Sequence, residues 1–429
     1  MPNPGGFNGR DNGSQPSNDE LSQELLQYAM ERLPLTRRLD RLKKKFGYVI
    51  GTTKLKQLNK EFNIPSARKP PPLPVATAVV CDVIATDIHK RNGPDTVMRM
   101  IASQGKYVIP RAMTRAIMRD NDPLGFEVRY RASRAPINRG VLTAKGLNHE
   151  GSADGHEKFS SMALQMGPVG FGIYAFREKL SGRILHGAVV PNVRKASTIG
   201  HVYLDMVSLH GRTFRQLTVD HGSETGDMYA AHAALRRLYA PDLDETEWKL
   251  FVAIQSTHNV CIENIWMRWL KTAGRNLQSI ILEGKTNGLF NPLDEVDINL
   301  FQWLWSQIVQ LEFDKFKQYW NCHRVRGQRK KELPSGATPL DVYENPEAYG
   351  YDDLSIPVEH EVVEGLRQQL EVTRSEAFRF VDDEFKAAAE EVYSEIGKPI
   401  LAIDQGWAIF SSMRVHLHAM YESSADVTL

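Results

Sequence analysis

Residues 183–220 have the sequence RILHGAVVPNVRKASTIGHVYLDMVSLHGRTFRQLTVD, and their hydrophobic pattern changes twice. Residues 183–190 form a mostly apolar run that is typical of a buried strand. Residues 198–209 repeat apolar side chains at helical spacing, and residues 215–219 predict a short strand that ends on Asp220. A strand, a helix and a strand in succession predict an α/β domain.

The same alternation continues on both sides of this segment. Downstream, residues 227–239 predict an Ala-rich helix, 249–254 a strand and 260–281 a long helix. Upstream, the apolar, Gly-punctuated run 160–176 predicts two strands of a hairpin. We therefore predict a mixed sheet with helices on both faces. A further helix at 301–320 carries an aromatic stripe that we assign to the core: Trp303, Trp305, Phe313, Phe316 and Tyr319.

The net charge of the chain is small, but it is unevenly distributed. The 429 residues include 53 Lys and Arg against 52 Asp and Glu. Residues 31–145 carry 24 Lys and Arg against 9 Asp and Glu, a net charge of +15, whereas residues 333–429 carry −13. Such asymmetry favours a nucleic-acid or membrane partner for the basic segment, the alternative being a solvated basic surface. The chain has no run of about 18 apolar residues, so we expect no membrane partner.

The basic segment contains two outlines of a helix, a short turn and a second helix. In the first, helices at 36–46 and 52–62 flank a Gly-containing turn. In the second, a helix at 75–90 is followed by helices that open at Gly93 and Ile109. This order is typical of a helix-turn-helix, which binds duplex DNA in the major groove. The Pro-rich segment 69–74 between the two outlines predicts a stiff, non-helical linker.

Cationic side chains cluster on helices of both outlines. Arg111, Arg115 and Arg119 are spaced by four and so share one helix face, as a phosphate-contacting or groove-reading helix requires. We expect double-stranded DNA as the partner of these side chains and of a second basic cluster in the first outline. That second cluster consists of Arg37, Arg38, Lys43, Lys44 and Lys45. It also leads us to expect a nuclear location, although it equally fits a DNA-contact helix.

Together these patterns divide the chain into segments. We predict a disordered N-terminus, two helix-turn-helix regions, a basic connector, an α/β core and an acidic C-terminal region that contains helices near 362–370 and 377–396. The corresponding ranges are 1–18, 19–68, 75–125, 126–145, 146–332 and 333–429.

Three carboxylates occupy positions from which they can converge. Asp154 lies just before the first expected strand, Asp220 ends a strand, and Glu263 lies in the first turns of the helix at 260–281. Hard oxygen ligands of this kind suit Mg²⁺ or Mn²⁺, and two such ions support phosphodiester chemistry. Spacing alone is weak support, since Glu224 and Asp227 could replace Asp220 in this assignment.

The segments around these carboxylates resemble the integrase core domain of retroviral integrases and DDE transposases. More closely, the chain is similar to integrase core domain proteins that are abundant in mushroom-forming fungi. The resemblance covers roughly residues 30–350 and is specific in the combination of its motifs. These are DGHEK at 154–158, TVDHGSET at 218–225, STHNVCIE at 256–263 with Trp266, FQWLW at 301–305, WNCHR at 320–324 and LPSGATP at 333–339.

The resemblance implies a ribonuclease H-like core in which Asp154, Asp220 and Glu263 bind two divalent metal ions. The implied reaction is hydrolysis at a DNA 3′ end, followed by attack of that 3′-OH on a target phosphodiester. Multimers on DNA are implied as well. Two alternatives stay open: a non-catalytic DNA-binding protein derived from a mobile element, and a ribonuclease H-like nuclease acting on RNA or RNA–DNA hybrids.

The chain departs from the family pattern at several positions. Gly151 replaces a frequent Trp, from which we expect a looser start of the strand at Asp154. Glu178 stands where relatives usually carry Asp. After Glu263, Met267 and Leu270 occupy positions that are Lys in retroviral enzymes. This leaves Arg268 and Lys271 as the nearest bases for DNA.

Overall fold

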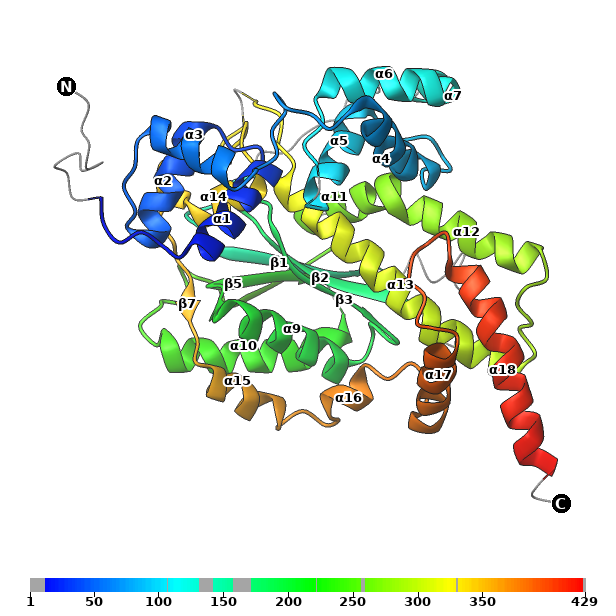
Figure 1. Ribbon diagram of the computed structural model, residues 1–429. Coiled ribbons are helices and arrows are strands. Elements are labelled where there is room, and N and C mark those ends of the chain that lie inside the picture. Colours follow the sequence, from blue (N-terminus) through cyan, green and yellow to red (C-terminus); the bar gives the residue numbers. More distant parts are fainter. Residues whose placement is uncertain are drawn as a thin grey trace. The chain divides into compact units, whose positions relative to one another are not determined.

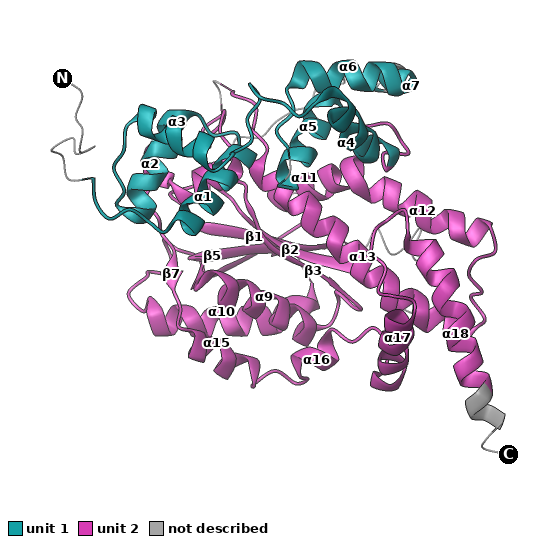
Figure 2. Ribbon diagram, viewed as in Figure 1, with its two compact units in different colours: residues 1–85, 92–133 teal, residues 86–91, 134–429 magenta. Residues whose placement is uncertain are grey.

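The computed structural model describes residues 12–105, 107–130, 142–156, 171–220, 222–255, 259–328 and 331–426. The chain divides into two compact units, which Figure 2 distinguishes by colour. The first comprises residues 1–85 and 92–133, and the second comprises residues 86–91 and 134–429. We call them the helical unit and the α/β unit and describe each by itself.

A five-stranded mixed sheet forms the centre of the α/β unit, in the order β3-β2-β1-β5-β6 (Figure 1). The first three strands are antiparallel neighbours, while β5 runs parallel to both β1 and β6. The predicted mixed sheet is thereby confirmed. Its strands are β1 (Glu150–His156), β2 (Gly172–Glu178), β3 (Ile184–Val190), β5 (Gln216–Asp220) and β6 (Phe251–Ile254).

The first strand begins earlier than the sequence indicated. We expected Asp154 to precede the first strand and a hairpin over 160–176, but Asp154 lies inside β1. The segment EGSADGH has little β-propensity, yet β1 forms because it pairs with β2 on one side and with β5 on the other. Of the predicted hairpin, residues 172–176 belong to β2, and residues 157–170 lie outside the described part of the chain.

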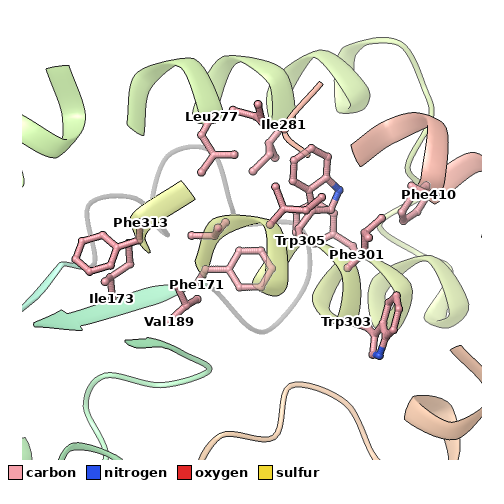
Figure 3. Packing of buried hydrophobic residues seen from close by; sticks show 14 of the residues in the cluster. Phe171, Ile173, Val189, Leu277, Ile281, Phe301, Trp303, Trp305, Phe313 and Phe410 are labelled. Carbon is pink, nitrogen blue, oxygen red and sulfur yellow. The ribbon is translucent and has the colours of Figure 1, made fainter. Parts of the chain in front are cut away.

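Helices cover both faces of the sheet. On one face, α9 (Ala196–His210) and α10 (Gly226–Tyr239) pack on side chains such as Tyr174 and Leu217. On the other face, α11 (Val260–Trp269) and α13 (Glu295–Cys322) pack on Ile173 and its neighbours (Figure 1). Figure 3 shows Phe313 of α13 beside Ile173. The predicted helix at 260–281 continues from α11 through η3, a π-helical turn at Leu270–Gly274, into α12 (Arg275–Thr286).

The C-terminal region completes the core of this unit. Phe410 from α18 (Gly406–Asp426) joins the cluster that contains the buried Trp305 of α13 (Figure 3). Phe385 from α17 (Asp383–Glu395) belongs to the same cluster. Trp303, Phe313 and Phe316 are also buried, which confirms their assignment to the core. Between α13 and α17 lie α14 (Pro339–Glu344), η4 (Pro346–Tyr349), β7 (Ile356–Pro357), α15 (His360–Arg367) and α16 (Arg374–Ala377). The short strand β7 pairs with β4 (Arg212–Thr213).

The helical unit contains seven helices among its described residues. They surround two clusters, one around Leu25, Leu42 and Leu55 and the other around Val80 and Ile101. The helix-turn-helix character of both groups stays a prediction. The bounds are α1 (Asn18–Met30), α2 (Leu35–Phe46), α3 (Thr52–Glu61), α4 (Leu73–Ala85), α5 (Pro94–Ser103), α6 (Arg111–Asn121) and α7 (Pro123–Tyr130).

Several boundaries of these helices differ from the sequence prediction. Helix α4 begins inside the predicted linker 69–74, because Pro74 lies in its first turn, where a missing N–H costs nothing. The N-terminal residues 12–17 are described and Ser17 caps α1, while residues 1–11 lie outside the described chain. Helix α7 occupies the start of the predicted connector 126–145, of which residues 131–141 are not described.

Helix α4 also ends at Ala85, before the predicted Lys90. The reason lies in the α/β unit, where residues 86–91 bind to α12. The Asn276 amide donates to the Asp87 carboxylate at 3.3 Å and accepts from the His89 backbone N–H at 3.1 Å. These hydrogen bonds hold the segment in a turn, closed by the Lys90 N–H donating to the Asp87 carbonyl at 2.9 Å, in place of a continued helix.

Candidate metal centre

Three carboxylates converge at one edge of the α/β sheet. Asp154 comes from β1, Asp220 from the end of β5, and Glu263 from the first turn of α11. One carboxylate oxygen of each residue lies within 4.8 Å of one from the others. All three side chains are half-buried, so the cluster is partly open to solvent.

The strand register accounts for the approach of the two aspartates. Ser152 of β1 pairs with Thr218 of β5 in the parallel direction. Asp154 and Asp220 each follow two residues later, so their side chains lie level with each other on the same face of the sheet. Leu217 and Val219, on the opposite face of β5, point into the cluster formed with α9 and α10.

Helix α11 supplies a hydrogen-bond donor to each aspartate. The Trp266 indole N–H donates to Asp154 Oδ2 at 2.9 Å. The Asn259 amide donates to Asp220 Oδ1 at 3.1 Å and to the Ala153 carbonyl at 3.3 Å. Neither Asn259 nor Trp266 was assigned to the site from sequence, although their spacing of four and three residues from Glu263 indicates a shared helix face.

The site concentrates negative charge in partly desolvated surroundings. Burial is the main cause that raises the pKa of Asp154 to about 7, and the charges of Asp220 and Glu263 act in the same direction. The hydrogen bond from Trp266 opposes this rise. Beneath the site, burial raises the pKa of Tyr174 well above its usual value, and nearby Asp154, Glu224 and Asp220 add to this effect. A bound cation would offset this repulsion between the carboxylates.

The donor set fits a hard divalent cation. Mg²⁺ and Mn²⁺ prefer oxygen ligands, and three carboxylates supply them from three separate elements. Glu224, on the turn η1 (Ser223–Thr225), is not among the three converging carboxylates. Asp227 of α10 is not among them either, and its side chain lies close to Gly200 of α9. Neither of these two sequence alternatives replaces Asp220 in the converging group.

A second cluster of possible metal ligands, formed by Asp294, Asp297 and His418, is already neutralised by an arginine. Oxygens of Asp294 and Asp297 and a ring nitrogen of His418 also lie within 4.8 Å of one another. Asp297 is fully buried, but its Oδ1 lies 2.6 Å from the Arg414 guanidinium, and its Oδ2 accepts the Asn291 N–H. Arg414 thus supplies the counter-charge that a metal would provide, and this group joins α18 to the start of α13.

Comparison with known proteins gives one family match. The model of the family described as integrase core domain matches residues 183–345. Residues 183–345 therefore form an integrase core domain. The matched range contains Asp220 and Glu263, whereas Asp154 lies before it on β1 of the same sheet. No curated protein matches the chain.

The two departures from the family pattern near β1 both have a structural explanation. A Cβ on Gly151 would lie 2.3 Å from the ring of Phe214, which fills the space above this position. The expected loosening at Gly151 is therefore wrong, because the buried Phe214 packs there instead. Glu178 is fully buried and accepts hydrogen bonds from the backbone N–H groups of Asn148, Leu180 and Ser181, closing the turn after β2.

The basic residues that we expect to bind DNA lie in both units of the chain. On the integrase core domain, Arg268 of α11 and Lys271 of η3 are exposed. In the helical unit, Arg111, Arg115 and Arg119 are exposed on α6, on the face opposite the buried Thr114, Ile117 and Met118.

The cluster on α2 is more mixed. Lys43, Lys44 and Lys45 are exposed, and Lys45 lies 2.5 Å from Glu24. Arg38 is half-buried and donates to the Leu33 carbonyl at 3.0 Å. Part of its guanidinium group is therefore engaged within the helical unit and is not open to DNA. Arg37 lies 3.9 Å from Asp40. Among the helices that the structure describes, none is long and apolar enough to cross a membrane.

Proposed function

We propose that this integrase core domain protein is a transposon-derived integrase or transposase that cuts DNA 3′ ends and transfers them to a target. The observation that carries the proposal is the convergence of Asp154, Asp220 and Glu263 within 4.8 Å of one another. A mixed sheet with helices on both faces supports a ribonuclease H-like assignment for the core.

Integrase-type domains generally use divalent metal ions. In our proposal, Asp154, Asp220 and Glu263 hold two Mg²⁺ or Mn²⁺ ions. When bound, such ions activate a water or a 3′-OH as nucleophile and stabilise the leaving oxygen of a phosphodiester. The fit rests on the oxygen-only donor set and on the raised pKa of Asp154, which is caused mainly by burial and increased by the neighbouring Asp220 and Glu263 carboxylates.

The surrounding residues have separate tasks in this proposal. Asn259 and Trp266 orient the two aspartates through the hydrogen bonds described above. Double-stranded DNA contacts the exposed Arg268 and Lys271 of the α/β unit, and the basic faces of α2 and α6 in the helical unit. We further propose that the protein assembles as a homo-oligomer on DNA and acts in the nucleus.

The test is metal-dependent nicking or strand transfer by the full chain on duplex DNA. We expect activity with Mg²⁺ or Mn²⁺, and we expect Asp220→Asn to abolish it because a metal ligand loses its charge. Asp227→Asn is the matched control, since Asp227 lies outside the converging carboxylates. Activity that survives Asp220→Asn contradicts the site assignment.

Substrate choice separates the alternatives. Metal-independent duplex binding without cleavage would favour the non-catalytic DNA-binding protein. Cleavage of RNA–DNA hybrids in preference to duplex DNA would favour the nuclease. Size measurements on DNA complexes and imaging of the tagged full chain in its host cells test the oligomer and the nuclear location.

A further inference from the structure

We propose that Trp266 and Asn259 are positioning residues that each fix one oxygen of an aspartate and thereby set the affinity of the site for divalent cations. The inference rests on the proposed function, because it assigns a role in the same metal centre. It concerns two residues that are hydrogen-bonded to the carboxylates but are not themselves candidate metal ligands. Ligands fixed in advance lose less freedom on binding, so they bind more tightly.

The first step of the argument is the geometry of α11. Asn259, Glu263 and Trp266 are separated by four and three residues, which places them on one face of a helix. This face lies against β1 and β5, because its outer members bond to Asp154 and Asp220. The Asn259 carbonyl also accepts the Glu263 backbone N–H at 3.1 Å, so the helix begins at the site itself. The first turns of one helix therefore orient all three carboxylates.

Trp266 is held firmly enough to direct its donor. Its side chain is buried, and its ring stacks on His156 with 4.9 Å between centroids and 15° between planes. Because the ring is clamped, its N–H occupies one oxygen of Asp154, Oδ2. Trp266 leaves the second oxygen of Asp154 for the cation in our proposal. A flexible donor could not impose this division between the two oxygens.

Asn259 fixes one oxygen of Asp220 and also connects β1 with β5 through hydrogen bonds. It is 2 % exposed, and its amide nitrogen bonds to β1 at Ala153 and to β5 at Asp220. Its amide oxygen is buried and has no hydrogen-bond partner among the described residues. The two hydrogen bonds that the amide nitrogen donates therefore orient the Asn259 side chain. This arrangement is expected of a residue whose role is to position Asp220.

Two substitutions remove these donors. Trp266→Phe keeps an aromatic ring against His156 and deletes the indole N–H together with part of the ring system. Its matched control is Trp305→Phe, which removes the same atoms from a fully buried side chain whose indole N–H has no partner among the described residues. Asn259→Ala removes the amide, and Asn264→Ala on the same helix is its control.

The experiment measures Mn²⁺ binding to the full chain by calorimetry and by the electron paramagnetic resonance spectrum of the bound ion, without DNA. We expect Trp266→Phe and Asn259→Ala each to weaken binding about 10- to 100-fold and to alter the spectrum. We expect the metal-free Tm of Trp266→Phe to match that of Trp305→Phe. A purely structural role would lower Tm and leave the spectrum of the bound ion unchanged.

The outcomes are distinct. If Mn²⁺ binds the wild type and Trp266→Phe equally well, the positioning role is overturned and the proposed function stands. If the wild type binds no Mn²⁺, both are overturned. Should Asn259→Ala fail to fold, the Trp266→Phe result decides, because that substitution keeps an aromatic ring in the buried position.

Discussion

Asp154 and Asp220 lie level with each other on two neighbouring parallel strands, each two residues beyond the paired Ser152 and Thr218. Parallel strands present their carboxyl ends at the same edge of a sheet, so one register fixes both side chains. Glu263 reaches them from α11, which packs on the same face. The acidic centre therefore depends on a strand pairing and a helix start, and not on any local sequence motif.

The raised pKa of Asp154 predicts pH-dependent metal binding. The pKa of about 7 lies above the usual 3.8, so the protonated carboxyl stabilises the metal-free fold at low pH, and this contribution is lost as pH rises through about 7. A cation binds the ionised form and displaces the proton. We expect Mn²⁺ affinity to rise about tenfold per pH unit below about pH 7 and to level off above it. Calorimetry in buffers of different ionisation enthalpy measures the released proton. Equal affinity at about pH 6 and about pH 8 contradicts the prediction.

Gly151 tests the packing beside β1. A Cβ at this position would lie 2.3 Å from the Phe214 ring, which is buried and cannot move away freely. We expect Gly151→Ala to lower the free energy of unfolding by about 1–3 kcal/mol, as overpacking does. In the background of Phe214→Leu the same change should cost clearly less, because the two positions share one space. Urea denaturation of the four proteins measures this coupling, and strict additivity argues against it.

The sequence predicted β3 and β5 well because their apolar runs are long and bounded by turns. It did not predict β1, since Gly151, Ser152 and Gly155 carry no strand pattern, and the strand exists only through its two partners. Likewise α4 was predicted too long, because the bonds from Asn276 that hold residues 86–91 come from a helix far along the chain.

The candidate site was accessible to sequence reasoning only in part. Asp220 and Glu263 mark a strand end and a helix start, which are readable patterns, and the family resemblance pointed to Asp154. Asn259 and Trp266 could have been found by counting four back and three forward from Glu263. The filling of the space at Gly151 by Phe214 could not, because nothing local connects the two residues.

We predict that the acidic C-terminal region, with its net charge of −13, weakens non-specific DNA binding because it repels the phosphates. Deleting residues 351–429 would remove buried side chains such as Phe410 and Phe385 and would unfold the core. The deletion therefore cannot test the effect of the acidic charge on DNA affinity. Changing the exposed Glu384, Glu391 and Glu395 of α17 to Gln keeps the packing and raises the net charge by three. We expect this triple variant to bind duplex DNA more tightly at low salt, with an unchanged Tm. Unchanged affinity in fluorescence anisotropy titrations contradicts the restraint.

The three arginines on α6 test the DNA-binding role of the helical unit. Arg111, Arg115 and Arg119 are exposed on one face, and removal of one phosphate-binding cation should reduce the slope of log affinity against log salt by about 0.9. We expect Arg115→Gln to lower that slope by about one and to weaken binding similarly for all DNA sequences. Arg237→Gln on α10 makes the same substitution at an exposed site outside the basic segment, and it should leave the slope unchanged. Equal slopes for both variants and the wild type would remove α6 from the DNA interface, and a weakening confined to certain sequences would indicate base readout in place of phosphate binding.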